Sequence, residues 1–371
     1  MSLKISQRTL LEHSEVKIEL LRLYLIRYLT ILNHSEYVEE VYLYDLFCGE
    51  GIYDNEGKGS PIIILDVLLE VLENNQNNTR FHCLFNDLDE SKIRNLESSI
   101  QQIDDKNLDR ISIQYSNNDY QDLIPSLSDQ FKSLQKQKAF VFIDPYGYKD
   151  IHIKDIEELL FSENVEVLLF LPTQFMFRFH EKETPESLKA FISELLPEEK
   201  WPKSSTGIAF IENLKIAFRD YFNSSRFVDS FIITRDKGQF FCLFFFTSHI
   251  LGFEKMLEAK WKLDEEEGRG WTFQPENSLF SELTKLPNIS RFKEELESFL
   301  KHRARCNAET YYFTIVRGFR TCHAVQMLKD WQTQNRLTSK NSNGTDARKG
   351  AFYLNFKDYR KDPTKIFLKL D

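Results

Sequence analysis

The first part of the chain repeats an apolar run followed by an amphipathic, helix-like segment. After a helix expected over residues 16–32, apolar runs occur at residues 37–47, 80–85, 110–115, 139–143, 165–171 and 240–247. These runs are rich in β-branched and aromatic residues and do not alternate cleanly with polar ones, which is typical of strands buried on both faces of a parallel sheet. With helical patterns between most of them, the sequence predicts an α/β fold: a Rossmann-like sheet with helices on both faces.

The last part of the chain has a different pattern. Helical periodicity covers residues 291–302, 308–316 and 321–336, and a Ser/Asn/Gly-rich loop at 339–345 precedes Arg348-Lys349 and an expected strand at 351–356. Three helices, a tight turn and a basic hairpin predict a C-terminal winged helix-turn-helix-like domain. A boundary near Pro275 divides the chain into domains 1–275 and 276–371.

Charge separates the same two regions. The chain carries −9 overall, whereas residues 301–371 hold fifteen Lys/Arg and six Asp/Glu, which leaves −18 on the first 300 residues. On the third helix, Ala324, Leu328 and Trp331 share one face. The remaining faces carry His323, Gln326 and Lys329, which we expect to face nucleic-acid bases, with Arg348 and Lys349 on phosphates. Chance clustering of surface charge, or docking of a protein, remains the alternative.

A glycine-containing turn follows the first predicted strand, at residues 45–51 (DLFCGEG). Its two glycines allow a sharp turn and a close approach to a ligand. A dinucleotide site would have a third glycine where Asp54 stands, and no Lys-Ser/Thr follows, so a phosphate-binding P-loop is excluded. Because acidic residues stand beside the turn, a ligand with a cationic amino-acid group, such as S-adenosylmethionine, suits it better than a pyrophosphate. Asp45, Phe47, Gly49 and Gly51 are the candidate cofactor contacts, and an ordinary acidic surface turn is the alternative.

Carboxylates also follow the next two predicted strands. Asp87 follows residues 80–85 and could accept both ribose hydroxyls, while Asp89 is expected to cap the next helix. Asp119 follows residues 110–115 and could receive the adenine amino group. Aspartate is common in loops, so Asp119 carries little weight by itself.

Asp144-Pro145-Tyr146-Gly147 ends the fourth predicted strand. Asp144 could accept a hydrogen bond from a substrate amine, and Tyr146 could stack on a planar base. The structural alternative is a turn favoured by Pro and Gly. Since the carboxyl ends of parallel strands meet at one edge, where α/β sheets bind ligands, we expect these carboxylates to lie close together.

Three further observations limit the class of protein. The five cysteines form no CxxC pair and are expected to be free thiols. The histidines are too dispersed to suggest a metal site. Charged residues interrupt the most apolar early segment, so neither a signal peptide nor a membrane span is expected, and a cytoplasmic location follows.

The chain resembles the three-Cys-motif partner (TcmP) family. The matching segments are residues 44–53 (YDLFCGEGIY), Gly59-Ser60-Pro61, residues 86–90, residues 144–147 and residues 244–271 (FFFTSHILGFEKMLEAKWKLDEEEGRGW). The resemblance extends over most of the chain from about residue 15 and includes the basic C-terminal region. It implies a bacterial protein with a methyltransferase-type fold, S-adenosylmethionine as cofactor, and a three-Cys-motif protein as partner.

Two functions remain open from the sequence. The leading hypothesis is a methyltransferase acting on a nucleic-acid amino group. The absence of a Pro-Cys pair argues against cytosine ring methylation, and only one proline follows Asp144. The alternative is a non-catalytic subunit that binds nucleic acid or protein on a retained methyltransferase scaffold.

Overall fold

The computed structural model describes residues 12–73, 78–145, 151–173, 193–194, 206–222, 225–235, 239–272 and 286–371. The chain forms two compact units, Met1–Gly252 with Gly270–Pro275, and Phe253–Arg269 with Glu276–Asp371. The division expected from sequence at Pro275 differs from this one in residues 253–269, which group with the second unit.

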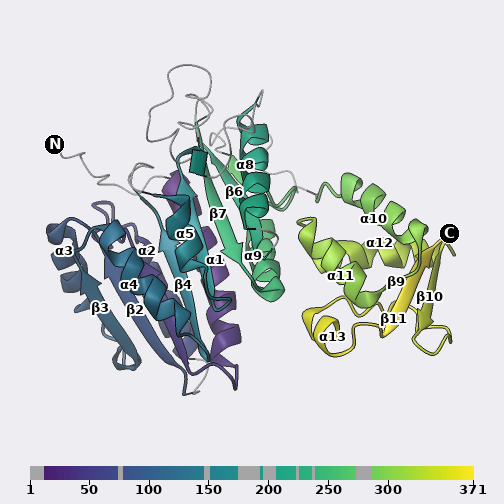
Figure 1. The fold of residues 1–371 in the computed structure, drawn as a ribbon, viewed down its shortest axis with the longest axis horizontal. Coiled ribbons are helices and arrows are strands. Elements are labelled where there is room, and N and C mark those ends of the chain that lie inside the picture. Colours follow the sequence, from purple (N-terminus) through teal and green to yellow (C-terminus); the bar gives the residue numbers. More distant parts are fainter. Residues whose placement is uncertain are drawn as a thin grey trace. The chain divides into compact units, whose positions relative to one another are not determined.

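The first unit is built on an eight-stranded sheet in the order β3-β2-β1-β4-β5-β7-β6-β8 (Figure 1). The strands are β1 Glu40–Asp45, β2 Arg80–Asn86, β3 Ile111–Ser116, β4 Gln137–Ile143, β5 Val165–Leu171, β6 Phe227–Thr234, β7 Phe240–Thr247 and β8 Gly270–Thr272. The first five are parallel, whereas β7 is antiparallel to both β5 and β6. The prediction of a mainly parallel α/β sheet is confirmed. The strand β6 was not predicted from the sequence.

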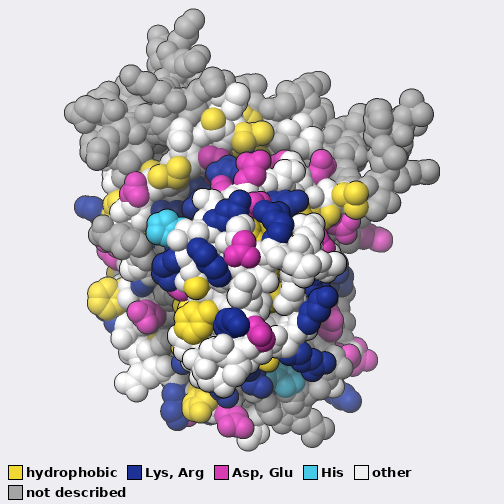
Figure 2. Space-filling view, turned by 90° about the vertical axis from the view of Figure 1, so that its right-hand side faces the viewer, with side chains coloured by type: hydrophobic (Ala, Val, Ile, Leu, Met, Phe, Trp, Pro, Cys, Tyr) yellow, Lys and Arg dark blue, Asp and Glu magenta, His cyan; other side chains and the backbone are white. Residues whose placement is uncertain are grey.

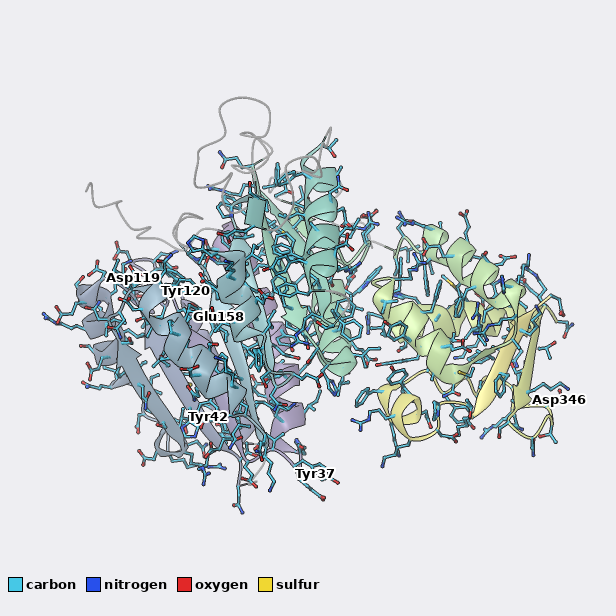
Figure 3. All side chains as sticks on the ribbon, viewed as in Figure 1. Tyr37, Tyr42, Asp119, Tyr120, Glu158 and Asp346 are labelled. Atoms are coloured by element: carbon cyan, nitrogen blue, oxygen red, sulfur yellow. The ribbon has the colours of Figure 1, made fainter. Side chains whose placement is uncertain are left out.

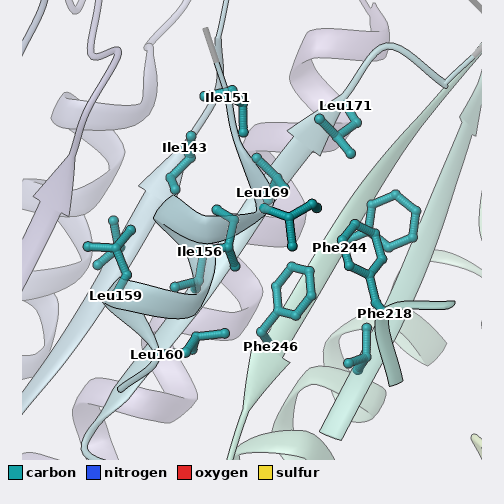
Figure 4. Packing of buried hydrophobic residues seen from close by; sticks show 14 of the residues in the cluster. Ile143, Ile151, Ile156, Leu159, Leu160, Leu169, Leu171, Phe218, Phe244 and Phe246 are labelled. Atoms are coloured by element: carbon teal, nitrogen blue, oxygen red, sulfur yellow. The ribbon is translucent and has the colours of Figure 1, made fainter. Parts of the chain in front are cut away.

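Helices cover both faces of this sheet. They are α1 Glu12–Asn33, α2 Ser60–Glu73, α3 Glu90–Ile100, α4 Tyr120–Lys132, α5 Ile153–Leu159 and α8 Gly207–Tyr221, with a 3-10 turn at Leu108–Arg110. Side chains of α4, α5 and α8 pack with one face of the strands in a single apolar cluster, part of which Figure 4 shows around Ile156, Phe218 and Phe246. On the other face, Tyr24 of α1 packs against Phe140 of β4. The central strands are therefore buried on both sides, which explains their continuous apolar runs.

The second unit includes most of α9 (Ile250–Leu263). Its other elements are α10 Ser290–His302, β9 Arg305–Cys306, α11 Asn307–Val316, α12 Thr321–Thr333, β10 Leu337–Asn341, α13 Phe356–Lys361 and β11 Ile366–Leu370. The three strands form an antiparallel sheet in the order β10-β11-β9. The indole N–H of Trp261 donates to the carbonyl of Gly318, at 2.9 Å, and so ties α9 to the turn before α12.

The prediction of a strand at residues 351–356 is wrong. Tyr353 has a φ of 53°, in the left-handed region, which interrupts an extended run. The strand that pairs with β10 is instead β11, where Ile366, Leu368 and Leu370 are buried in alternation with Phe367 and Lys369. The loop expected at 339–345 also overlaps the end of β10.

All five cysteines are free, as expected, and only Cys322 is exposed. Among the described residues, no helix combines the length and the apolar character that crossing a bilayer requires.

Candidate functional site

The turn after β1 is fixed by backbone hydrogen bonds to its neighbours. The N–H of Cys48 donates to the carbonyl of Asn86 at 2.8 Å, and the N–H of Gly59 donates to the carbonyl of Gly51 at 2.7 Å. Gly49 and Gly51 have φ values of 65° and 82°. A Cβ on Gly51 would lie 2.5 Å from Cδ1 of Leu96. Glycine is therefore required at position 51 by both conformation and space.

Asp45, the last residue of β1, is a fully buried carboxylate. Among the described residues, neither of its oxygens accepts a hydrogen bond that meets geometric criteria. Burial raises the pKa of Asp45 to about 7. The negative charges of Asp144 and Asp87 raise it further, while the nearby Ser60 hydroxyl and Phe47 amide partly offset the effect. A buried carboxylate at the edge of a sheet, with its charge only partly stabilised by neighbours, is a group that a cationic ligand would satisfy.

Asp144 lies at the same edge as Asp45. In the pairing of β1 with β4, Asp45 stands opposite Phe142, two residues before Asp144. The strand order reverses direction between β1 and β4, because β2 and β3 extend to one side and β5 to the other. Open α/β sheets bind ligands at this switch point, outside the carboxyl ends of the strands.

The structure adds Lys17 to this edge. Its ammonium group on α1 forms an ion pair with Oδ2 of Asp144 and lies 4.5 Å from the centroid of the Phe170 ring. The sequence showed Lys17 only as a charge that interrupts an apolar helix, so its role was missed. No local pattern could have revealed a partner 127 residues away.

Tyr53 is a second residue that the sequence did not reveal. Its ring is half-buried in the loop after the glycine turn. Burial raises the pKa of Tyr53 to about 12, with further contributions from the charges of Asp144, Asp45 and Glu50. The hydroxyl is therefore protonated at neutral pH and lies within electrostatic range of the carboxylates.

Asp87 joins the turn to the end of β2. Its Oδ2 accepts the N–H of Gly49 at 3.1 Å, its Oδ1 accepts the N–H of Asp89 at 2.9 Å, and Lys92 lies 3.7 Å from Oδ2. Asp87 is buried and supports the turn directly. To accept both ribose hydroxyls, Asp87 would have to give up part of its hydrogen bonding to the amides of Gly49 and Asp89. Its sequence-based role as the ribose acceptor stays a prediction.

Asp119 lies at the carboxyl end of β3, one strand further out. Its side chain accepts the N–H of Gln121 at 2.9 Å and caps α4. Figure 3 shows Asp119 and Tyr120 at one end of α4, with Tyr37 at the opposite edge of the sheet. The ring of Phe47 stacks on Tyr120 with centroids 5.3 Å apart. A contact between Asp119 and adenine stays a prediction, and the cap is the role that the structure shows.

Most of the predicted site residues meet at one edge of the sheet. Asp45, Gly49, Gly51, Asp87 and Asp144 come from the ends of β1, β2 and β4, which the backbone pairing brings side by side. The second candidate catalytic residue, Tyr146, lies outside the described residues. The cap expected at Asp89 is confirmed, because its carboxylate accepts the N–H of Ser91.

The basic face expected on the second unit requires one correction. His323 is buried, and its ring lies edge-on to Trp261 with centroids 4.4 Å apart. It therefore does not face outward, and the prediction that it contacts bases is wrong. The helical periodicity placed His323 off the Leu328 face but could not show that α9 covers it.

The other basic-face residues are at the surface. Gln326 and Lys329 are exposed on α12, and Arg348 and Lys349 are exposed in the loop after β10. The N–H of Gly350 donates to the Gln332 side chain at 2.9 Å, which brings this loop against α12. Figure 2 views the end of the chain that carries β10 and β11, where Lys and Arg side chains gather with fewer acidic ones among them.

No family model matches the sequence, and no curated protein matches it. Solved structures similar to the chain include the methyltransferase domain of bacterial CtHen1 (14% identity, TM-score 0.30, covering 62% of this chain and 98% of that one). A second is an O-methyltransferase from Bacillus cereus in complex with SAH (11%, TM-score 0.31, 61% and 80%). A third is the glycopeptide N-methyltransferase MtfA complexed with sinefungin (10%, TM-score 0.27, 60% and 85%).

The sheet itself defines the class of the first unit. The order β3-β2-β1-β4-β5 is the order of the first five strands in a Rossmann-like sheet, with the switch point between β1 and β4. The strand β7 lies between β5 and β6 and is antiparallel to both. The first unit is therefore a mixed α/β, Rossmann-like unit with helices on both faces of its sheet.

Proposed function

We propose that this protein is an S-adenosylmethionine-dependent methyltransferase that acts on an amino group of a nucleic acid. The observation that carries the proposal is the position of Asp45, a fully buried carboxylate whose charge its neighbours only partly stabilise, at the switch point beside Asp144. A ligand with an ammonium and a sulfonium group would satisfy this charge.

The residues present suit such a cofactor. The turn through Gly49 and Gly51 leaves backbone without Cβ atoms at the edge of the sheet, and Asp87 stands at the end of the neighbouring strand. When bound, S-adenosylmethionine would supply a methyl group made electrophilic by the positive sulfur.

The role of Asp144 follows from its position. One carboxylate oxygen is paired with Lys17, and the other can accept a hydrogen bond from a substrate amine. That bond orients the nitrogen lone pair toward the methyl group. S-adenosylmethionine would supply the methyl group, with the electron pair of the broken S–C bond left on sulfur, and the amine would release one proton to solvent. Stacking of a base on Tyr146 is part of the proposal on sequence grounds.

The second unit supports nucleic acid as the substrate class. Its order α10–β9–α11–α12–β10–α13–β11 resembles that of a winged helix-turn-helix with a short helix inserted between the last two strands, and we take α12 as the recognition helix and the loop after β10 as the wing. We assign base contacts to Gln326 and Lys329 and phosphate contacts to Arg348 and Lys349. A three-Cys-motif protein is the proposed partner, on the resemblance described above.

A non-catalytic subunit is the second candidate. It is favoured by the ion pair between Lys17 and Asp144, which already occupies one oxygen of the proposed catalytic carboxylate. Such a subunit would keep the fold and the nucleic-acid surface without transferring a methyl group.

Two experiments separate the candidates. Calorimetric titration with S-adenosylmethionine and its demethylated product tests cofactor binding. A radiolabelled-methyl transfer screen over DNA, RNA and protein, with and without the partner, then tests catalysis. Asp144→Ala should abolish transfer, and calorimetry should still detect binding of the cofactor. Cofactor binding without transfer to any acceptor would favour the non-catalytic subunit.

A further inference from the structure

Lys17 is a cation held at the edge of the sheet by residues from three elements. It extends from α1 to Asp144 after β4 and lies near the Phe170 ring of β5. Its side chain is 13% exposed and that of Asp144 is 19% exposed, so the pair is largely shielded from solvent but still accessible. A lysine ammonium has three donor hydrogens, and the bond to Asp144 uses one of them.

A further carboxylate, that of Asp45, lies at the same edge as the ion pair between Lys17 and Asp144. Asp45 lies at the end of the strand beside that of Asp144. It is fully buried, and Ser60 and Phe47 only partly offset the effect of burial on its charge. Lys92 also lies at this edge, beside Asp87. The same edge of the sheet therefore carries a buried carboxylate, Asp45, and an ammonium group, that of Lys17, which has one ion-pair partner, Asp144, among the described residues.

This arrangement is complementary to a zwitterion. In an α-amino acid, the ammonium and the carboxylate are attached to the same carbon. A ligand whose ammonium approaches Asp45 must therefore place its carboxylate close by, where it needs a positive partner. A ligand with an ammonium alone would leave the donors of Lys17 unused.

We propose that Lys17 binds the carboxylate of the amino-acid part of S-adenosylmethionine, while Asp45 accepts the ammonium. This assignment rests on the proposed function and adds to it a binding residue from α1. It makes α1 part of the cofactor site, in addition to its packing role against the sheet.

The test compares two ligands that differ only in the carboxylate: S-adenosylmethionine and decarboxylated S-adenosylmethionine, which keeps the sulfonium and an ammonium. Calorimetry on the full chain measures both dissociation constants. The wild type should bind the carboxylate-bearing ligand about 10- to 100-fold more tightly, the range for a charge-assisted hydrogen bond. Lys17→Met should remove this preference, and Lys17→Arg should keep most of it.

Lys58→Met is the matched control. Lys58 lies in the loop beside the glycine turn and pairs with Asp66 at 2.6 Å, so the variant also loses one positive charge and one ion pair. It should keep the wild-type preference. If Lys17→Met does not fold, Lys17→Gln takes its place, and its preference between the two ligands is compared with that of the wild type.

Three results would overturn the proposal. Equal binding of the two ligands by the wild type would show that no group reads the carboxylate. An unchanged preference in a folded Lys17→Met protein would leave the ion pair with Asp144 a structural contact. If the wild type binds neither S-adenosylmethionine nor its demethylated product, the proposed function itself fails first. That outcome is distinct from the other two.

Discussion

The backbone N–H of Gly49 donates a 3.1 Å hydrogen bond to the carboxylate of Asp87, so the glycine turn after β1 and the end of β2 are directly joined. The proposed cofactor turn and the proposed ribose acceptor are therefore one structural unit. A change in either residue should affect both ligand binding and stability.

Asp87→Ala should weaken binding of the demethylated cofactor by about 1.5–3 kcal/mol, the scale of hydrogen bonds to a charged group. It should also lower the free energy of unfolding by about 1–3 kcal/mol, because the amides of Gly49 and Asp89 lose their acceptor. Calorimetry and urea unfolding measure the two effects. Asp89→Ala removes only the cap of α3, so it should cost about 1 kcal/mol of stability and leave affinity unchanged. Unchanged affinity in a folded Asp87→Ala protein would place the ribose elsewhere.

Asp45 should make the unliganded protein less stable as the pH rises. Its pKa is about 7 in the folded protein against an ordinary value of 3.8. Between these values the folded state binds the extra proton, so stability falls as the pH rises from about 4 to about 7. The total is on the order of 4 kcal/mol.

Asp45→Asn should remove this dependence. Urea unfolding at pH 5 and pH 8 gives the free energy of unfolding of both proteins, and the contribution of Asp45 is the difference between wild type and variant. Glu166, whose pKa is also raised by burial, contributes equally to both proteins, so its effect cancels. At pH 8 the variant should be the more stable protein. Parallel stability curves for the two proteins would mean that Asp45 does not titrate in this range.

His323 should make the second unit less stable as the pH falls, which is the opposite of the effect expected for Asp45. Burial, with the nearby charge of Arg320, lowers the pKa of His323 to about 4 from 6.5. The unfolded state then binds the extra proton between these values. Stability of the second unit should fall as the pH decreases from about 6.5 to 4, by on the order of 3 kcal/mol.

His323→Leu should reduce this loss at low pH, measured by unfolding at pH 5 and pH 7. His302→Leu is the matched control, because His302 is exposed at the end of α10 and the same substitution there should leave the acid sensitivity intact. His323→Leu should also leave nucleic-acid affinity unchanged at neutral pH. A selective loss of binding by this variant would instead restore His323 to the interface.

The double substitution Arg348→Ala with Lys349→Ala should weaken nucleic-acid binding to all sequences alike. Each phosphate contact releases counterions, so the slope of log affinity against log salt should become shallower by up to about 2 on duplex DNA. Fluorescence anisotropy on the full chain at several salt concentrations measures this slope.

The control for that experiment is Lys132→Ala with Lys136→Ala. These lysines are exposed on the first unit and pair with Asp129 and Glu39, so the same net charge is removed away from the proposed surface. The slope should not change. An equal effect of the two double variants would assign the binding to overall charge rather than to the loop after β10.

The sequence by itself determined the sheet and the edge where the site lies. Strands buried on both faces must be apolar throughout, so β1, β2, β4 and β5 were visible as continuous runs. Parallel strands share a carboxyl edge, so Asp45, Asp87 and Asp144 could be placed together before the structure was known. The strand β10 of the second unit was less visible, because its sequence, LTSKN, resembles a loop in composition.

Only the tertiary structure decided which charges meet at this edge and which are covered. Helical periodicity shows which residues share a face, but not what packs against that face. Lys17 therefore could not be assigned to Asp144 without the fold, and His323 could not be placed under Trp261. The raised pKa of Asp45 and the lowered pKa of His323 follow from burial by segments far away in the chain, which no local pattern records.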